Sequence, residues 1–321
     1  MGQGQSQSSA SGLTLKSLAQ SLSNGDFKNV IVMCGAGIST SAGVPDFRSP
    51  SFGLYNQIRK VQDLPYPEAI FEGAFFQRNP VPFYTLVRSI FPQRLCPTDT
   101  HKFFALLHQK GKLSSYGGKR YHLCHFFIGI LRRVYTQNID ALEVLGGAPE
   151  EKVIEAHGTF RESFCQACDA KYELSWLKDQ IFKPETNDGV PKCTKCATGV
   201  VRPSVVFFGE TLPRRFWENL DADFKQCDCL IVMGTSLAVA PFNALIARPP
   251  KTATRVFINK TKPGAVGFAG WMMGLGRNSV TFTNANDLVI LDDCDKTVRE
   301  ICRQVNWEQE LDALQVRILE P

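Results

Sequence analysis

Four cysteines in the middle of the chain have the spacing of a metal site. They form the pairs CQAC, Cys165 to Cys168, and CTKC, Cys193 to Cys196. Two thiolates separated by two residues can direct both sulfurs at one tetrahedral ion, and a second pair completes the coordination sphere. An ion held by four protein sulfurs has no open position, so its role is structural. The pattern predicts one structural zinc ion on Cys165, Cys168, Cys193 and Cys196; the alternative is four unrelated buried cysteines.

A glycine turn begins the second group of residues that could do chemistry. Gly35, Ala36 and Gly37 follow the apolar run 30–33, as in a dinucleotide-binding turn, whose glycines let backbone amides approach a pyrophosphate. The third glycine of that fingerprint is replaced by Thr40, and a loop rich in Pro and Ser follows. The turn predicts a bound nucleotide in a site unlike that of an ordinary dehydrogenase.

Polar residues after a later apolar run add groups for acid–base chemistry. YTQNIDALE places Gln137, Asn138 and Asp140 where a doubly wound sheet presents its ligand groups. His157 follows in EAHG, and its side chain has an unperturbed pKa near neutrality, which suits proton removal. An isolated histidine is more often structural, but these neighbours favour a base. HLCH, residues 122–125, lacks further ligands and predicts no second metal.

The elements that must position these groups are short apolar runs. Strands are expected at 30–33 and in VYTQNID, VVFFGE, CLIVMGTS, RVFIN and DLVIL, which begin at Val134, Val205, Cys229, Arg255 and Asp287. A short amphipathic helix is expected after residue 12, and His101 to Gln109 resembles a core helix with Phe103, Phe104, Leu106 and Leu107 inside. Repeated strands with polar ends predict an α/β fold, a doubly wound parallel (Rossmann-like) sheet. A smaller inserted lobe contains the four-cysteine zinc module and a helical lid.

The predicted domain organisation follows from these elements. Residues 1–25 form a disordered tail and a short helix, 26–310 a catalytic domain, and 311–321 a C-terminal tail. Within the domain, Rossmann-like parts occupy about 26–55, 98–160 and 200–305, the helical lid about 56–97, and the zinc module about 161–200.

Composition narrows the class of protein. The 321 residues have 44% hydrophobic and 21% charged residues and a formal charge of +5, with basic residues scattered along the chain. This is typical of a globular protein and does not indicate direct nucleic-acid binding. Eleven cysteines, four of them in metal-type pairs, favour a reducing compartment. No apolar run approaches the roughly 20 residues of a membrane span.

The N-terminal residues match a lipidation pattern. Met-Gly-x-x-x-Ser is the pattern for myristoylation of Gly2, which would give weak, reversible membrane association. The alternative is a Gln- and Ser-rich tail that matches by chance. The segment shows no clear import signal, so the expected location is cytoplasmic, with mitochondria as the alternative.

GAGISTSAGVPDFRS, YTQNID, EAHG, the two cysteine pairs, VVFFGE, GTS and a later IN-K together resemble the sirtuin family, the NAD-dependent protein-lysine deacylases. The resemblance runs in this order from about Asp26 to Val305. It is most similar to the deacetylating branch with mitochondrial and cytosolic members. It implies removal of acetyl groups from lysines of acetylated protein substrates, giving nicotinamide and acetyl-ADP-ribose, with NAD consumed and zinc retained.

The resemblance also implies roles for residues. His157 is the general base, and Asn138 and Asp140 complete the catalytic set. The nicotinamide pocket is lined by Ile38, Asp46, Phe47, Asn138, Ile139 and Asp140. Further cofactor contacts are Gly35, Ala36, Gly37, Ser39, Arg48, Tyr55, Gln137, Gly234, Thr235, Ser236, Asn259, Lys260 and Cys294. The acyl-lysine tunnel contains Phe71, Ile139, His157, Val205 and Phe208.

Acyl preference is read from the residues near Tyr55. Members that remove acidic acyl groups place an arginine three residues after this tyrosine, because a buried carboxylate needs a cation. Here Ile58 occupies that position and Arg59 follows it. Acetyl or longer apolar acyl groups are therefore favoured over succinyl.

One segment departs from the family pattern. Ser114 to Ile130 interrupts what would otherwise read KGKL-LRRVYTQNID. It is either a tolerated surface loop or a spurious insertion from an erroneous gene model, and a folded insertion could displace the strand before Asn138. Protein mono-ADP-ribosyl transfer stays open as an alternative to deacetylation. The insertion also leaves open a second alternative, a catalytically impaired protein that binds NAD or a partner.

Overall fold

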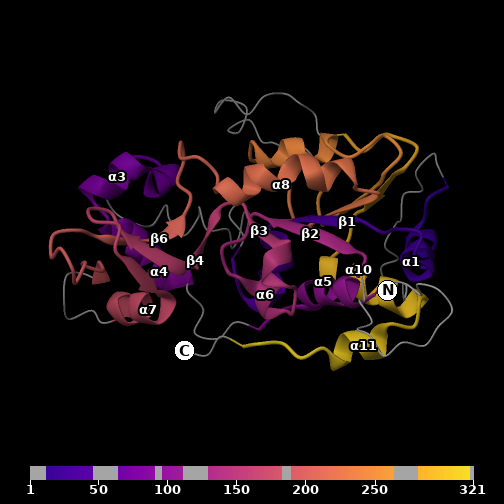
Figure 1. The fold of residues 1–321 in the computed structure, drawn as a ribbon, viewed down its shortest axis with the longest axis horizontal. Coiled ribbons are helices and arrows are strands. Elements are labelled where there is room, and N and C mark those ends of the chain that lie inside the picture. The colour runs from indigo at the N-terminus through magenta and orange to yellow at the C-terminus, as the bar shows by residue number, and fades with distance from the viewer. Residues whose placement is uncertain are drawn as a thin grey trace, which may run out of the picture.

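The chain folds into two lobes of different size (Figure 1). A computed structural model describes residues 12–45, 64–90, 96–110, 129–182, 189–263 and 281–318. The larger lobe contains a six-stranded sheet, and the smaller one contains a three-stranded sheet with helices around it. Strand β4, Gly158–Cys165, leaves the larger lobe and enters the smaller one, so the two lobes share one continuous stretch of chain.

The larger sheet is parallel throughout and has the order β3-β2-β1-β7-β8-β9. Its strands are β1 (Val30–Cys34), β2 (Leu131–Thr136), β3 (Val153–Glu155), β7 (Cys229–Met233), β8 (Thr254–Ile258) and β9 (Asp287–Ile290). The chain builds outward in opposite directions from β1, so β1 and β7 flank the point at which the strand order reverses. In doubly wound sheets ligands bind beyond the carboxyl ends of the strands at this point. The predicted fold class is confirmed.

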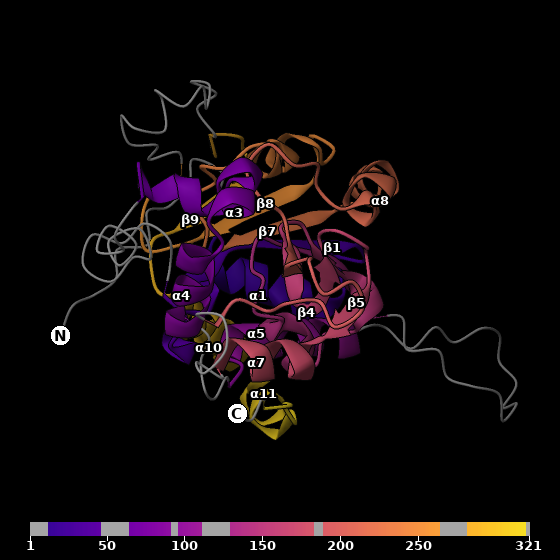
Figure 2. The same cartoon turned by 90° about the vertical axis from the view of Figure 1, so that its left-hand side faces the viewer.

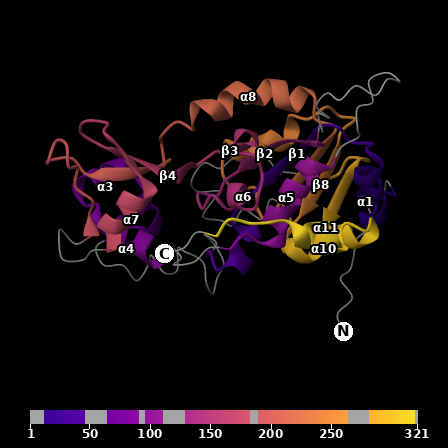
Figure 3. The same cartoon turned by 60° about the horizontal axis from the view of Figure 1, so that its bottom comes forward.

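Helices cover both faces of this sheet (Figure 3). One face carries α1 (Leu15–Asn24), α5 (Asp99–Gln109), α6 (Leu142–Leu145), α10 (Cys294–Gln304) and α11 (Glu308–Ala313); the other carries α8 (Arg214–Lys225) and the 3-10 helix η6 (Phe242–Ala247). Both β1 and β7 are buried along their whole length, which explains their unbroken apolar sequences. The described part of the chain contains no helix with the length and apolar character to cross a membrane.

The two helices expected from the sequence are confirmed. Helix α1 begins after Thr14, whose side chain accepts a hydrogen bond from the Ser17 amide, and it ends at Gly25, where φ is +70°. Glycine tolerates this left-handed conformation without steric cost. In α5 the four predicted apolar side chains from Phe103 to Leu107 are buried.

The smaller lobe is built around an antiparallel sheet with the order β5-β4-β6 (Figure 2). Strands β5 (Lys171–Glu173) and β6 (Val201–Val205) flank β4, and helices α3 (Gly73–Arg78), α4 (Val81–Ile90) and α7 (Leu174–Phe182) pack around them with the 3-10 helix η3 (Pro67–Phe71). The core contains an aromatic cluster in which the ring centroid of Phe207 lies 5.5 Å from Phe76 and 5.3 Å from Phe83.

The sequence misplaced one strand and missed three others. VVFFGE was expected in the parallel sheet, but β6 ends at Val205 and pairs antiparallel with β4. The run is apolar because Phe207 belongs to the aromatic core of the smaller lobe, while Phe208 forms only an isolated bridge with Glu72. The strands missed are β3, three residues long, which pairs with β2 shortly before His157, and β4 and β5 of the smaller sheet.

Residues 111–128, which contain most of the departure from the family pattern, lie outside the described residues. The residues on either side of this segment are described, and they are hydrogen-bonded to each other. The Ile130 amide donates to the carbonyl of Lys110 at 2.7 Å, and the Val30 amide donates to the carbonyl of Ile130 at 2.9 Å. Strand β2 then pairs with β1 through Val32↔Val134 to Cys34↔Thr136. The strand that carries the Asn138 loop therefore holds its place beside β1, and the displacement considered from the sequence is not found.

Candidate active site and metal site

The four predicted metal ligands lie together in the smaller lobe. One ligand atom from each of Cys165, Cys168, Cys193 and Cys196 lies within 4.8 Å of all the others. The sulfur atoms of Cys165 and Cys196 are 3.6 Å apart, and those of Cys168 and Cys193 are 3.7 Å apart. A tetrahedral ion about 2.3 Å from each sulfur sets a sulfur–sulfur distance of about 3.8 Å, whereas a disulfide would need about 2 Å. The separations fit a zinc site with four cysteine ligands.

Hydrogen bonds to the sulfurs support the thiolate form that zinc requires. The amide of Ala167 donates to Cys165 at 3.4 Å, the amide of Lys195 to Cys193 at 3.3 Å, and the amide of Gly199 to Cys196 at 3.3 Å. Burial opposes ionisation of Cys193, but hydrogen bonds from the Tyr172 hydroxyl and backbone amides lower the pKa of its thiol to about 6. The site can hold one ion with a structural role.

The glycine turn at the end of β1 packs against the turn at the end of β7. A Cβ on Gly37 would lie 2.7 Å from both Cα and O of Gly234, and a Cβ on Gly35 would lie 2.9 Å from Cβ of Thr235. The Gly35 amide donates to the Met233 carbonyl at 3.2 Å, and the Gly37 amide donates to the Gly234 carbonyl at 2.8 Å. These two amides are therefore hydrogen-bonded within the protein. The glycines are needed because two loops meet at the switch point.

Replacement of Gly37 by alanine tests this contact. The added methyl group meets backbone atoms of Gly234, so one of the two loops must shift. We expect the KM for NAD in deacetylation to rise by on the order of tenfold, about 1.4 kcal/mol of binding free energy. Gly73→Ala is the matched control, since its Cβ would have only Glu210 within 4 Å, at 3.9 Å. An unchanged KM in Gly37→Ala would contradict this role of the turn.

The loop after β2 is held by both neighbouring strand ends. The Thr235 hydroxyl donates to Oε1 of Gln137 at 2.6 Å, and the Gln137 amide donates to the Cys34 carbonyl at 3.0 Å. The side-chain amide of Asn138 is buried and donates to the carbonyl of Gly35 and the hydroxyl of Ser39, each at 3.3 Å. The predicted residues of β1, β2 and β7 thus form one connected group.

His157 lies immediately after β3 and is oriented by this loop. Its Nδ1 is 3.1 Å from the carbonyl oxygen of Gln137. A carbonyl only accepts hydrogen bonds, so Nδ1 carries the proton of the neutral ring and Nε2 has a free lone pair. Burial lowers the pKa of His157, and the hydrogen bond to Gln137 only partly opposes this. At neutral pH the imidazole is therefore uncharged and can accept a proton at Nε2.

The predicted acyl-lysine residues lie beside His157, between the lobes. Gly158 pairs with Val205, and the Val206 amide donates to the His157 carbonyl at 2.9 Å. The Phe208 amide donates to the Phe71 carbonyl at 2.8 Å, and their ring centroids are 6.5 Å apart. Phe208 is 52% exposed, a large apolar surface for a side chain beside a polar site. Ile139 packs against the same core.

The remaining predicted cofactor residues follow β7, β8 and β9. Ser236 continues the Thr235 turn, and the Asn259 amide donates to the Ile290 carbonyl at 3.1 Å. Nζ of Lys260 is 3.0 Å from Asp293, and Cys294 begins helix α10, with its thiol 3.6 Å from the Ile258 carbonyl. Asp46, Phe47, Arg48 and Tyr55 lie outside the described residues, as does Gly2.

Two buried titratable residues at the site were missed by sequence reasoning. Nε2 of His101 is 3.4 Å from the Ser39 hydroxyl, and its Nδ1 accepts a hydrogen bond from the Thr98 amide at 3.1 Å. Glu143 is fully buried beneath the loop after β2. A carboxyl group within the apolar stretch IDALEVL was the signal for Glu143; nothing in the sequence distinguished His101 from a solvent-facing helix residue.

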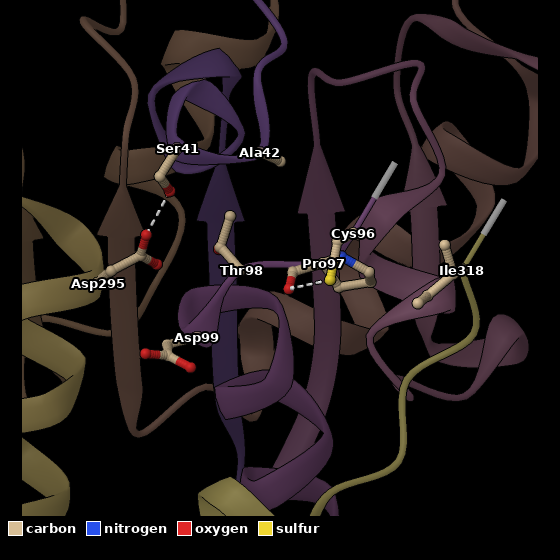
Figure 4. A pocket seen from close by; sticks show the side chains of 8 residues that line it. All are labelled: Ser41, Ala42, Cys96, Pro97, Thr98, Asp99, Asp295 and Ile318. Atoms are coloured by element: carbon tan, nitrogen blue, oxygen red, sulfur yellow. Dashed lines mark hydrogen bonds between the residues drawn. The ribbon is translucent and has the colours of Figure 1, made fainter. Parts of the chain in front are cut away.

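A pocket of about 530 Å³ lies next to Ser41 and Ala42, shortly after the glycine turn (Figure 4). Its lining comes from the first turn of α5, Ser41 and Ala42, Asp295 and Ile318, with Cys96 and Pro97. The Asp295 carboxylate accepts hydrogen bonds from the Ser41 hydroxyl and from the Thr100 amide, the latter at 2.9 Å. None of the predicted site residues lines this pocket, so it is separate from the group around His157.

A nucleotide-binding sheet with a histidine base at its switch point, joined to a lobe with four clustered cysteines, defines a zinc-containing enzyme of nucleotide chemistry. A family model described as the Sir2 family matches residues 35–117 and 126–241. The chain belongs to the Sir2 family. The gap between the matched stretches falls inside the segment 114–130 that departs from the pattern.

Curated relatives agree with this assignment over nearly the whole chain. The chain is 42% identical to the NAD-dependent protein deacetylase sirtuin-2 of Danio rerio over 306 residues, which are 94% of this chain and 74% of the relative. It is 39% identical to the NAD-dependent protein deacetylase hst2 of Schizosaccharomyces pombe, covering 94% of this chain and 79% of the relative. It is also 39% identical to the NAD-dependent protein deacetylase sirtuin-3 of Mus musculus, covering 95% and 80%.

Proposed function

We propose that the protein is an NAD-dependent protein deacetylase that removes acetyl groups from lysine side chains. The observation that carries the proposal is the position of His157. This neutral base, with a free Nε2, lies beside the Asn138–Asp140 loop and near the aromatic pair of Phe71, which is partly buried, and Phe208, which is exposed. The names of the Sir2-family relatives support the same activity.

The residues at the switch point would hold NAD. The turn 35–39, the loop 137–140 and Gly234 to Ser236 surround the pyrophosphate and nicotinamide ribose, and Asn259, Lys260 and Cys294 lie toward the adenosine end. When bound, NAD supplies a glycosidic bond whose cleavage releases nicotinamide and leaves an electrophilic ribose carbon. The Asp140 carboxylate and the amide of Asn138 orient the reacting ribose.

His157 moves the proton. We assign Nε2 as the acceptor for the proton of a ribose hydroxyl, because Nδ1–H is fixed on the Gln137 carbonyl. Removal of this proton lets the acyl group migrate to the sugar. General-base assistance of this kind contributes about 100- to 10,000-fold in rate.

The acyl-lysine would enter between the lobes. Phe208 presents exposed apolar surface beside Phe71, and Ile139 packs against the same apolar cluster as Val205, which pairs with Gly158 next to His157. Such a tunnel accepts a neutral acylated lysine and disfavours the free ammonium, whose desolvation is costly. Acetyl and longer apolar acyl groups are the proposed substrates.

The proposed surroundings are a reducing compartment, the cytoplasm, with mitochondria as the alternative. All ten cysteines among the described residues are free thiols, and a zinc site with four cysteine ligands needs thiolates. The proposed partners are acetylated proteins, with no direct nucleic-acid contact. Myristoylation of Gly2 would add weak membrane association.

The activity is tested by incubating purified protein with NAD and an acetyl-lysine peptide. The expected products are the deacetylated peptide, nicotinamide and acetyl-ADP-ribose, detected by mass spectrometry. Nicotinamide release without deacetylated peptide would favour ADP-ribosyl transfer instead. NAD binding without turnover would favour a binding protein.

A further inference from the structure

A buried carboxyl group, Glu143, lies beneath the catalytic loop and has no role in the reaction described above. Its Oε1 accepts hydrogen bonds from the Thr136 hydroxyl at 2.5 Å, from Nδ2 of Asn138 at 3.4 Å and from Sγ of Cys34 at 3.6 Å. Its Oε2 is buried and has no hydrogen-bond partner within the described ranges. A buried carboxylate needs hydrogen bonds or a cation at both oxygens, so a charged Glu143 would leave Oε2 uncompensated among the described residues.

A second carboxyl group lies next to it. One ligand atom from each of Glu143, Asp140 and His101 lies within 4.8 Å of the other two. His101 offers no positive charge, because burial lowers the pKa of its ring to about 3. Two carboxylates this close repel each other, and the described residues place no cation between them, so the pair tends to retain a proton.

The other groups that face Glu143 do not supply a cation. Cys34 on β1 remains a thiol because burial raises its pKa, and Thr136 on β2 is uncharged. Glu155 on β3 is negative and pairs with Arg161 at 2.5 Å. No lysine or arginine in the described part of the chain forms a hydrogen bond or ion pair with Glu143 or Asp140.

The hydrogen bonds decide which carboxyl group keeps the proton. Burial raises the pKa of Asp140, but its carboxylate accepts a hydrogen bond from the Leu142 amide at 3.0 Å, and this bond and the Ser39 hydroxyl oppose the shift. Asp140 is also partly exposed, whereas Glu143 is fully buried. Charge is therefore better tolerated on Asp140 than on Glu143.

We propose that Glu143 is a positioning residue that carries the single proton of an Asp140–Glu143 carboxyl pair, so that Asp140 is the one charged group of the pair at the ribose. The proposal rests on the proposed function for the role of Asp140. In the neutral form Glu143 offers an acceptor to Thr136 and Asn138 and does not repel Asp140. Ionised Glu143 displaces the Asp140 carboxylate and draws the Asn138 amide away from Ser39.

The pH at which Glu143 ionises is the pH at which this arrangement is lost. Burial, followed by the charge of Asp140, raises the pKa of Glu143 to about 8. The neutral pair therefore persists at neutral pH and is lost as the pH rises through about 8.

The first test compares the pH profiles of kcat/KM for NAD between pH 6 and 9.5, each normalised to its own maximum, with an acetyl-lysine peptide as co-substrate. Glu143→Gln keeps a neutral acceptor at every pH. We expect the wild-type profile to fall about tenfold per pH unit above pH 8, and this fall to be absent in Glu143→Gln. Glu173→Gln, at an exposed carboxyl group on β5, is the matched control and should keep the wild-type fall. Superimposable profiles of wild type and Glu143→Gln would overturn the proposal.

The second test needs no activity. The folded-state pKa of Glu143 is raised above its unfolded value of about 4.3, so its stability contribution is full below that value and is lost as the pH rises to about 8. Urea unfolding is measured at pH 5.5, 6.5 and 7.5. The ratio of the folding constant of Glu143→Gln to that of wild type should rise by up to about tenfold per pH unit. A constant difference would overturn the proposal. Absence of deacetylation in both wild type and Glu143→Gln would instead reject the proposed function. The unfolding comparison would still show whether Glu143 holds a proton.

Discussion

Replacement of His157 by alanine is expected to reduce kcat for deacetylation by about 100- to 10,000-fold while NAD binding is largely retained. The neutral imidazole holds Nδ1 on the Gln137 carbonyl and keeps Nε2 free, and its ring centroid lies 6.2 Å from that of Phe242. The decrease is measured as acetyl-ADP-ribose formed per enzyme under saturating NAD and peptide, and NAD affinity is measured by calorimetry. Since burial lowers the pKa of His157, wild-type turnover should fall with acid only below its ordinary value of about 6.5.

His108→Ala is a matched control for this loss. His108 lies in α5, away from the group around His157, and its replacement should leave turnover close to that of wild type. Undiminished deacetylation in His157→Ala would remove His157 from the mechanism. A loss of NAD binding equal to the loss of turnover would show that the residue shapes the cofactor site rather than moving a proton.

Replacement of Cys165 by serine is expected to release zinc, unfold the smaller lobe and abolish most activity. Apparent binding free energies of structural zinc are about 10–16 kcal/mol in small domains, and that binding energy contributes directly to folding. Cys165 is fully buried and is the last residue of β4. Its replacement therefore removes a zinc ligand that belongs to the antiparallel sheet itself. Zinc content is measured by atomic emission, and the unfolding of the lobe by limited proteolysis.

Cys96→Ser is the corresponding control, since Cys96 is an exposed free cysteine outside the cluster of four cysteines. It should keep one zinc ion per chain and the wild-type proteolysis pattern. A metal-free Cys165→Ser protein with full activity would contradict the structural role of the ion.

The sheet could be predicted from the sequence because its strands are buried on both faces. Runs such as CLIVM in β7 are then apolar without interruption, and they are followed by the polar residues that the sequence predicts to bind ligands. VVFFGE has the same composition for another reason, since Phe207 belongs to the core of the smaller lobe. Composition alone does not distinguish these two environments, and β3 is too short to give a periodic signal.

Sequence reasoning predicted those parts of the site whose residues lie close together in the chain, and it missed contacts between distant segments. The cysteine pairs define a site by spacing alone, and the four sulfurs do meet. The fixed tautomer of His157 could not be predicted, because it depends on the carbonyl of Gln137, twenty residues earlier on another strand. The close packing of Gly37 on Gly234 is likewise a contact between distant loops, which the sequence did not indicate.

His157 is attached to both lobes at once. Its ring is hydrogen-bonded to Gln137 of the large sheet, while its carbonyl accepts from Val206 and the next residue, Gly158, with φ +79°, pairs with β6. A hinge rotation that separates the lobes must therefore break one of these bonds or carry the imidazole with it. In this fold, separation of the two lobes is therefore coupled to the position of the His157 imidazole.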